Sequence, residues 1–344
     1  MPRLNELFVA IRTRNVEDAG TDDAPSLLVN RAGQDLFEVP LDVDPDGLGA
    51  GRAAAFRIDV SDQALDSDGL QFILLAGGDD AWAPEQIVVW GIAGTLPREV
   101  VVPLAAEIDL AYPSTDHDAG VWLSTDASEG VRAYLLRSVG SGSRTTRAWR
   151  MIAVFVTEPY VGYWPGGGPG PSGPFEETGT DGPVTLQAGG PGRLVLSYQI
   201  PSTPQGDLWH GHANLYLADL AAPFSRADVE GGAFSLTIGS GDWWVPTYVA
   251  VFGLDTTYGQ PNVLIPFVHS PAIALERMSA DPSEGVHTNV LPSALAIEPG
   301  PVRPPTGALG GQLQPMARDA EPGRPRKVLR IDREVPGRVR PARD

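Results

Sequence analysis

Cysteine is absent from all 344 residues of the sequence. This absence excludes a disulfide framework, a thiolate metal site and a cysteine nucleophile. No apolar run approaches the roughly 18 residues of a membrane-spanning helix. The start, MPRLNELFVAIRTRNVEDAG, lacks the apolar core and the cleavage site of a signal peptide. We therefore expect a soluble protein without signal peptide or transmembrane segment, either cytoplasmic or associated with a virion or another assembly.

Positive charge is scarce, and Lys327 is the only lysine. The formal net charge of −18 argues against nucleic-acid binding by the main body. The charge is uneven, because residues 297–344 hold ten basic and six acidic side chains while the rest of the chain is acidic. A basic arm on an acidic body favours protein partners, through self-assembly or a larger complex in which the arm docks on a neighbour. The alternative is that the arm folds back on its own domain.

Helical periodicity is also scarce, and short β-branched or aromatic segments alternate with Gly, Pro, Asp and Ser. This pattern is typical of an all-β fold. The expected strands are Leu7–Arg12, Ser26–Asn30, Ala54–Val60, Leu70–Leu75, Gln86–Ile92, Val100–Leu104, Gly120–Leu123, Ala133–Leu136, Arg150–Val156, Arg193–Ile200, Ala213–Ala218, Ala233–Ile238, Thr247–Gly253, Asn262–Val268 and Ala272–Glu276.

The run Tyr163–Pro183 is too rich in Gly and Pro to hold a helix or a sheet ladder, so it predicts a linker. We expect tandem antiparallel β-sandwich domains on either side of it. The predicted parts are a first sandwich domain at 1–160, a Pro/Gly-rich linker at 161–185, a second sandwich domain at 186–297 and an extended Pro/Arg-rich C-terminal arm at 298–344.

An internal repeat relates the two halves. With a shift of 162 positions, residues 70–92 align without a gap to residues 232–254, and a second segment, Asp126–Val131, resembles Asp281–Val286. Such self-similarity indicates duplication of a strand–turn–strand unit. Trp244 aligns with Trp82, which favours a core or hinge position over a sugar-stacking surface. The eight identities of the first alignment are Phe72, Leu74, Gly77, Asp80, Trp82, Pro84, Val89 and Gly91, paired with Phe234, Leu236, Gly239, Asp242, Trp244, Pro246, Val251 and Gly253.

The N-terminal quarter, Leu4–Ile92, resembles a PLAT (lipoxygenase-homology, LH2) domain. The likeness rests on the turn Asn15–Ala24, which contains Ala-Gly-Thr-Asp, and on the strand and acidic loop of Gly69–Pro84. In the second half, Ala213–Leu217 is similar to the family strand that follows the turn, with His212 in place of an Asp. The resemblance implies a sandwich of two antiparallel sheets that acts as a non-catalytic attachment module for membranes or proteins.

The same turns suggest a calcium site. Carried over from the family pattern, Gly20 offers a backbone carbonyl and Asp22, Asp79 and Asp80 offer carboxylates, the hard oxygen ligands that Ca²⁺ takes. The alternative is that Asp and Gly serve only as turn residues. We expect any calcium site in the N-terminal module alone, because the second copy has Gly241 and His212 where carboxylates would be needed. Pro25 would make the following strand an edge strand.

A second metal hypothesis concerns His210 and His212. Residues two apart on a strand face the same side, so both imidazoles could reach one Zn²⁺ or Cu²⁺ ion. A third ligand would have to come from Asp207, His269 or His287. The alternative is a pair of solvated histidines in a polar loop.

Catalytic motifs such as the Gly-x-Ser-x-Gly elbow, the phosphate-binding loop and the Rossmann fingerprint are absent from the sequence. We therefore expect no enzyme. The favoured function is a structural or adaptor protein that binds other proteins through tandem β-sandwich modules, in a phage-like or other large assembly. The alternatives are a calcium-dependent module that binds membranes or carbohydrate, and a metal enzyme that uses His210 and His212.

Overall fold

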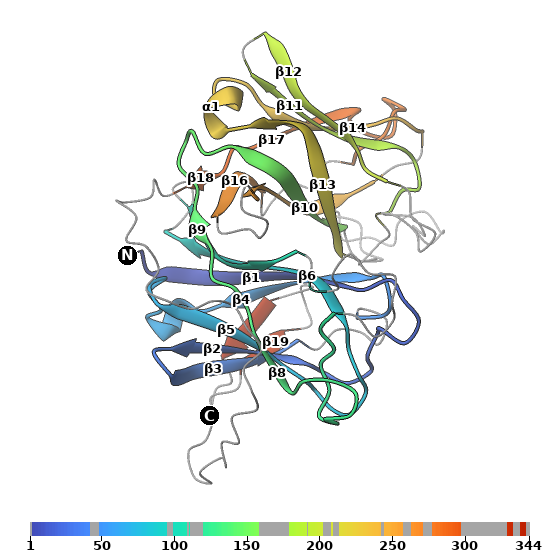
Figure 1. Cartoon of the computed structure of the whole chain (residues 1–344). Coiled ribbons are helices and arrows are strands. Elements are labelled where there is room, and N and C mark those ends of the chain that lie inside the picture. The colour runs from blue at the N-terminus through green and yellow to red at the C-terminus, as the bar shows by residue number, and fades with distance from the viewer. Residues whose placement is uncertain are drawn as a thin grey trace, which may run out of the picture. The chain divides into compact units, whose positions relative to one another are not determined.

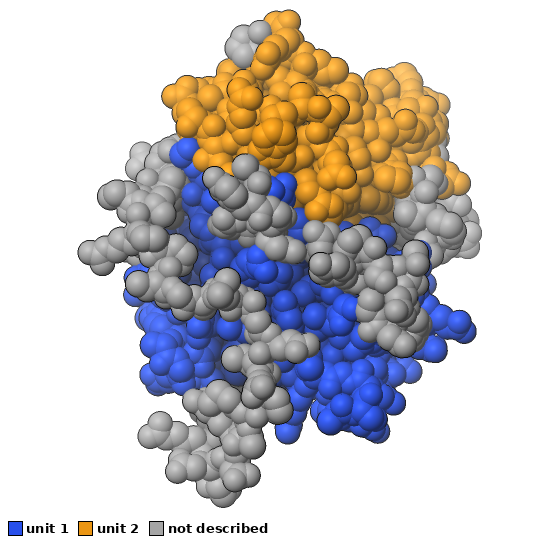
Figure 2. All heavy atoms as spheres, in the orientation of Figure 1, with its two compact units in different colours: residues 1–143, 256–264, 295–344 blue, residues 144–255, 265–294 orange. Residues whose placement is uncertain are grey.

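The computed structural model divides the chain into two compact units (Figure 2). Unit 1 holds residues 1–143, 256–264 and 295–344, and unit 2 holds residues 144–255 and 265–294. The described residues are 2–41, 48–94, 99–108, 110, 120–157, 179–190, 192–201, 208, 213–241, 244–256, 263–270, 277–296, 329–332 and 338–341, with the last two ranges and 295–296 described by their backbone alone. Within these ranges nearly all regular structure is β-strand, which confirms the predicted all-β class.

The N-terminal segment of unit 1 contributes nine strands, drawn in blue to green in Figure 1. A 3-10 turn at Ser61–Gln63 follows the fourth of them. The strands are β1 (Leu4–Thr13), β2 (Ser26–Arg31), β3 (Gln34–Pro40), β4 (Ala53–Asp59), β5 (Leu70–Leu75), β6 (Pro84–Ala93), β7 (Val100–Glu107), β8 (Ala133–Leu135) and β9 (Gly140–Ser141).

Two antiparallel sheets form the sandwich of unit 1, in the strand orders β7-β6-β1-β4 and β3-β2-β5-β8. The second sheet follows the alternation of its sequence, because Leu70, Phe72 and Leu74 of β5 are buried while Gln71, Ile73 and Leu75 are partly exposed. One apolar core draws side chains from both sheets, as a sandwich requires.

The first sheet of unit 1 is buried on both faces. Val9 and Val89 belong to the core cluster, whereas Phe8 and Trp90 lie on the opposite face and stack with ring centroids 5.4 Å apart. Phe8 and Trp90 are nonetheless 5% and 0% exposed. This explains why β6 is a nearly continuous apolar run instead of an alternating one.

Unit 2 repeats the same strand pairing. Its sheets have the orders β13-β10-β15-β16 and β12-β11-β14-β17. Strands β10 to β17 of unit 2 therefore correspond in chain order to strands β1 to β8 of unit 1. The elements are β10 (Ala148–Thr157), β11 (Val184–Gly190), β12 (Arg193–Gln199), β13 (Ala213–Phe224), α1 (Arg226–Val229), β14 (Phe234–Ile238), β15 (Pro246–Asp255), β16 (Val263–Ser270) and β17 (Thr288–Leu291).

The division between the units differs from the predicted one. It falls between Ser143 and Arg144 instead of near residue 160, because β10 is an inner strand of the second sandwich and pairs with β13 on one side and β15 on the other. The Pro/Gly-rich run predicted as an interdomain linker therefore connects β10 to β11 within unit 2. Residues 158–178 of that run lie outside the described part of the chain.

Unit 1 also gains strands from the C-terminal part of the chain. β18 (Leu295–Ala296) pairs in parallel with β7, and β9 pairs in parallel with Val263 and Leu264 at the start of β16. In the arm, β19 (Leu329–Asp332) and β20 (Arg338–Pro341) form an antiparallel hairpin, and β20 lies parallel to β4 with Arg338 opposite Arg57. These arm strands thus lie on their own unit.

The prediction that Pro25 makes the next strand an edge strand is wrong. β2 begins one residue later and pairs along its length with β3 and β5. Pro25 needs no ladder donor there, and its carbonyl accepts the Leu41 N–H at 2.7 Å. The structure also contains β3, β11 and β17, which the sequence pattern did not predict.

A buried hydrogen-bonded relay recurs in both sandwiches. The indole N–H of Trp82 donates to Thr13 Oγ1 at 3.0 Å, and that hydroxyl donates to the Leu48 carbonyl at 3.1 Å. In unit 2, Trp244 donates to Thr157 at 2.9 Å, and Thr157 donates to the Leu208 carbonyl at 3.2 Å. Both tryptophans, predicted as core residues, are at most 1% exposed.

Replacing either threonine by valine keeps the side-chain shape but removes the acceptor of a buried N–H. We expect Thr13→Val and Thr157→Val each to lower the free energy of unfolding by about 1–3 kcal/mol. Thr13→Ser and Thr157→Ser, which keep the hydroxyl, are the matched controls in urea denaturation of the full chain. Equal losses for valine and serine would contradict a role for the hydrogen bonds.

Candidate binding site

Two loops meet at one end of unit 1, and they carry Asp22 and Asp80, two of the residues nominated as calcium ligands. The Asp22 N–H donates to the Asp80 carboxylate at 2.8 Å, and the Asp80 N–H donates to the Asp23 carboxylate at 3.0 Å. Thr21 Oγ1 accepts the Asp23 N–H at 3.0 Å. Two of the three acids therefore tie the loops together by capping backbone N–H groups, a common use of Asp in turns.

A third loop joins this end of the sandwich. Ser124 Oγ donates to the Asp79 carbonyl at 3.0 Å, and the Thr125 N–H donates to the Gly78 carbonyl at 2.8 Å. Gly20 lies elsewhere in the turn, where a Cβ would stand 3.0 Å from the Cα of Gly49. Among the described residues, no group of three or more acidic or histidine side chains is arranged to hold a metal ion. Calcium binding at Gly20, Asp22, Asp79 and Asp80 stays a prediction.

Unit 2 contains a counterpart of this turn that the sequence reasoning missed. Gly179-Thr180-Asp181 repeats Gly20-Thr21-Asp22, and Thr180 Oγ1 accepts the Gly182 N–H at 2.9 Å as Thr21 does for Asp23. The following strand is β11, so the assignment of Ala213–Leu217 to that place is wrong: those residues belong to β13, the counterpart of β4. The repeated Gly-Thr-Asp tripeptide could have identified this turn, but it lies within the run that was predicted to be a linker.

Glycine occupies opposite members of an equivalent residue pair in the two units. Asp23 faces Gly78 in unit 1, and Gly182 faces Ser240 in unit 2. In unit 1 the Asp23 carboxylate lies over Gly78, where a Cβ would come within 2.1 Å of it. In unit 2 the positions are Gly182 and Ser240, and a Cβ on Gly182 would come within 1.8 Å of the Ser240 hydroxyl. At this point of contact the two loops have room for only one side chain. The first loop supplies it in unit 1 and the second loop supplies it in unit 2.

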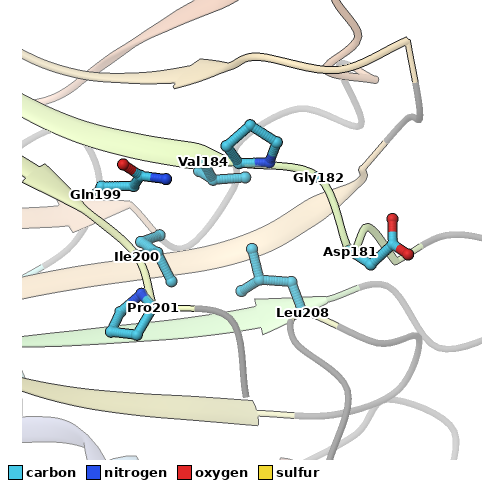
Figure 3. A pocket seen from close by; sticks show the side chains of 8 residues that line it. Asp181, Gly182, Val184, Gln199, Ile200, Pro201 and Leu208 are labelled. Carbon is cyan, nitrogen blue, oxygen red and sulfur yellow. The ribbon is translucent and has the colours of Figure 1, made fainter. Parts of the chain in front are cut away.

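Beside Gly182 the structure has a pocket of about 220 Å³ (Figure 3). Its floor is apolar and buried, formed by Val184, Ile200 and Leu208, which are 1%, 5% and 1% exposed. The remaining lining residues, which are more exposed, are Asp181, Gly182, Pro183, Gln199 and Pro201. In Figure 3 the side chains of Asp181 and Gln199 lie at opposite ends of the pocket, so the space between them is lined mainly by apolar side chains.

Hydrogen bonds between its walls hold the pocket in shape. The Ile200 N–H donates to the Val184 carbonyl at 2.9 Å, and the Thr180 N–H donates to the Leu208 carbonyl at 3.3 Å. Leu208 has φ of +49°, a left-handed conformation that is costly for leucine. Its carbonyl also receives the hydroxyl of Thr157, so the buried relay fixes one wall of the pocket.

The outer faces of the second sheets differ between the units. In unit 1 the face turned away from the core carries Leu28, Ile73, Leu75 and Leu135. The equivalent positions in unit 2 are Gln187, Ser235, Thr237 and Val290. Strand alternation places the four side chains of unit 1 on the face opposite Leu27, Phe72 and Leu74 of the core. Of these four, Leu28 is buried at 7% exposure, and Ile73, Leu75 and Leu135 are partly exposed.

The predicted transition-metal site involves residues outside the described part of the chain. His210, His212 and Asp207 lie outside the described residues. Of the other nominated ligands, His269 is buried in β16, and His287 is exposed just before β17. Zn²⁺ or Cu²⁺ binding by His210 and His212 therefore stays a prediction.

Asp126 and Tyr134 in unit 1 and Asp281 in unit 2 have shifted pKa values. The N–H and hydroxyl of Ser128 donate to Asp126 at 2.8 and 2.7 Å and lower its pKa, and Ser283 does the same for Asp281 at 2.8 and 2.6 Å. Burial, followed by the charge of Glu107, raises the pKa of Tyr134 to about 12. The identical Ser–Asp turns in both units are a further mark of the repeat.

No family model matches this chain, and no curated protein matches it. Within the described residues, no helix has the length and hydropathy of a membrane span.

The Ser–Asp turns predict a specific acid titration. Because the pKa values of Asp126 and Asp281 are lowered on folding, their contribution to stability is present above the ordinary value of 3.8 and is lost as the pH falls through the folded-state pKa. We expect Ser128→Ala, which keeps the backbone N–H donor and removes only the hydroxyl donor, to raise the pKa of Asp126 part of the way towards 3.8 and to leave the pKa of Asp281 unchanged. Carboxyl-detected NMR titration measures both, and an unchanged Asp126 would contradict the assignment.

The different positions of glycine in the two turns predict that one substitution can compensate for the stability lost through another. Gly78→Ser alone should destabilise the chain by about 1–3 kcal/mol, because its Cβ meets the Asp23 carboxylate. Asp23→Gly combined with Gly78→Ser reproduces the pair found in unit 2 and should recover at least half of that loss. Urea unfolding of both variants, with Asp23→Gly alone as control, tests this. A double variant no more stable than Gly78→Ser would contradict it.

Proposed function

We propose that this chain is a non-catalytic adaptor whose β-sandwich units bind other proteins. The observation that carries the proposal is the apolar outer face of unit 1, formed by Leu28, Ile73, Leu75 and Leu135 on three neighbouring strands. Leu28 is buried, and Ile73, Leu75 and Leu135 are partly exposed. The apolar area that these three leave exposed gains free energy when a partner covers it.

Comparison of the two units supports the proposal. The inner side chains are kept, with Phe72 and Leu74 matched by Phe234 and Leu236, while Ile73 between them is matched by Ser235. Because unit 2 holds its core with an outer face that is polar except for Val290, the fold does not require the apolar face of unit 1. The apolar face of unit 1 therefore serves something other than folding, and protein binding is the function that such a face supports.

The arm adds a second route to association. β20 lies beside β4 through backbone pairing, and the same pairing can be supplied by the arm of a neighbouring copy. This supports a role in a large assembly, phage-like or other. The PLAT resemblance is consistent with the same proposal, since it implies an attachment module.

The proposal is tested by placing a lysine at the centre of the apolar outer face of unit 1. We expect Ile73→Lys to keep the melting temperature and to weaken binding of protein partners at least tenfold, because a charged group cannot be buried in an apolar contact without penalty. Ser235→Lys, at the equivalent position in unit 2, is the matched control and should leave binding unchanged.

Native mass spectrometry of the full chain in extract of its source cells identifies the partners, and titration of the purified partner gives the affinity. A wild-type chain that remains an unbound monomer, or Ile73→Lys binding as tightly as wild type, would contradict the proposal.

A further inference from the structure

We propose that the end of unit 2 around α1 binds an acidic segment of a partner protein, with Arg147 and Trp149 as its main contacts. The inference rests on the proposed function as a protein-binding adaptor and names the chemistry of one partner. It concerns unit 2, whereas the apolar outer face lies on unit 1, so the two proposals can fail separately.

Arginines gather around α1, which lies against β11 (Figure 1). Unit 2 contains six arginines and no lysine. An N–H of α1 donates to the Arg144 carbonyl at 3.0 Å, and the Arg193 guanidinium donates to Asp228 of α1 at 3.2 Å. Arg147 and Arg150 flank the start of β10, which pairs with the end of β13 just before α1. The five arginines at this end are Arg144, Arg147, Arg150, Arg193 and Arg226.

Ion pairs neutralise only part of this positive charge. The pairs are Arg144–Glu230, Arg150–Asp219 and Arg193–Asp228. Arg147 is exposed and forms no salt bridge within the described part of the chain. Hydrogen bonds from Ser225 lower the pKa of Asp228, and the charges of Arg193 and Arg147 lower it further. Among the described residues, this end of unit 2 therefore has an excess of positive charge, in a chain whose formal net charge is −18.

A β-bulge turns Trp149 out of the strand at this end. The register of β10 shifts between Ala148 and Arg150, and Trp149 between them is 45% exposed. β1 of unit 1 has the same bulge at Asn5, whose amide donates to the Gly94 carbonyl. Bulges commonly re-aim one side chain. In unit 2 the bulge thus presents an indole to solvent where unit 1 has an amide that is already hydrogen-bonded.

A second exposed apolar side chain belongs to the same end of unit 2. Leu194 follows Arg193 on β12 and is 61% exposed. The equivalent positions of the β2–β3 hairpin in unit 1 are Asp35 and Gln34. Tryptophan and arginine are enriched among the residues that dominate the energy of protein interfaces, and arginine can bind a carboxylate through two parallel hydrogen bonds. Unit 2 therefore combines apolar contacts with carboxylate recognition where unit 1 has polar side chains.

A protein segment fits this surface better than a nucleic acid does. Nucleic-acid binding depends on neutralising many phosphates at once, and the formal net charge of −18 opposes the approach of a long polyanion. A few arginines beside exposed apolar side chains match a segment that carries both carboxylates and apolar side chains.

The experiment measures the anisotropy of a fluorescein-labelled peptide, EDFEDLEDF, with the full chain at low salt. We expect this peptide to bind, and Arg147→Glu to weaken its binding at least tenfold, because the charge that attracts the carboxylates is reversed. Arg3→Glu, at the equivalent position before β1, makes the same change in net charge and should alter the affinity less than twofold. Trp149→Ala should weaken binding at least fivefold and keep the melting temperature, since the indole is exposed.

The peptide QNFQNLQNF, in which amides replace the carboxylates, should bind at least tenfold more weakly. Equal binding of the two peptides, equal effects of Arg147→Glu and Arg3→Glu, or no binding of the acidic peptide to wild type would overturn the assignment. Tighter binding of an oligothymidylate of the same charge would overturn it in favour of a nucleic acid. Self-association of the chain that Arg147→Glu abolishes would overturn it in favour of a second copy. Ile73→Lys should bind the acidic peptide as wild type does, so these outcomes leave the test of the apolar outer face unaffected.

Discussion

A buried indole N–H must find an acceptor, and this requirement organises one end of each sandwich. Thr13 and Thr157 stand at the last positions of β1 and β10, where their hydroxyls accept from the tryptophan and donate to a carbonyl of the connection that precedes β4 or β13. Three segments distant in sequence are thereby held together. In unit 2 the turn and the pocket wall at Leu208 depend on this arrangement, because the carbonyl that ends the relay also accepts the Thr180 N–H of the Gly-Thr-Asp turn.

Around this shared frame the two copies have diverged in their surfaces more than in their cores. The exchange of Asp23 and Gly78 for Gly182 and Ser240 changes which loop supplies the side chain without changing the loop contact. Loss of the side chain at position 182 accompanies a pocket beside the turn of unit 2. In the second sheets, the divergence separates an apolar face from a largely polar one. Duplication followed by surface change gives one chain two differently lined surfaces on one scaffold.

The strand pattern was predictable where alternation or β-branching was strong. β5 was predicted residue for residue as Leu70–Leu75, and the repeat placed Trp82 and Trp244 correctly in the core. β3 was missed because Gln34, Asp35 and Glu38 mask its alternation, and β11 because it follows a Gly/Pro-rich run. The meeting of Asp22 with Asp80 was also foreseeable. The pocket was not, since it combines a turn, the end of β12 and Leu208, whose left-handed backbone no local pattern indicates.

The discontinuity of unit 1 has a consequence for biosynthesis. The parallel neighbour of β7 is β18, whose residues 295 and 296 are made almost two hundred positions after β7. The first nine strands therefore leave the ribosome with that stretch of the β7 edge open, while the whole of unit 2 is being translated. An open edge is a template for pairing with other chains, and domains generally fold as they emerge. The order of synthesis thus leaves Val100 and Val101 without this strand partner until the last part of the chain has emerged.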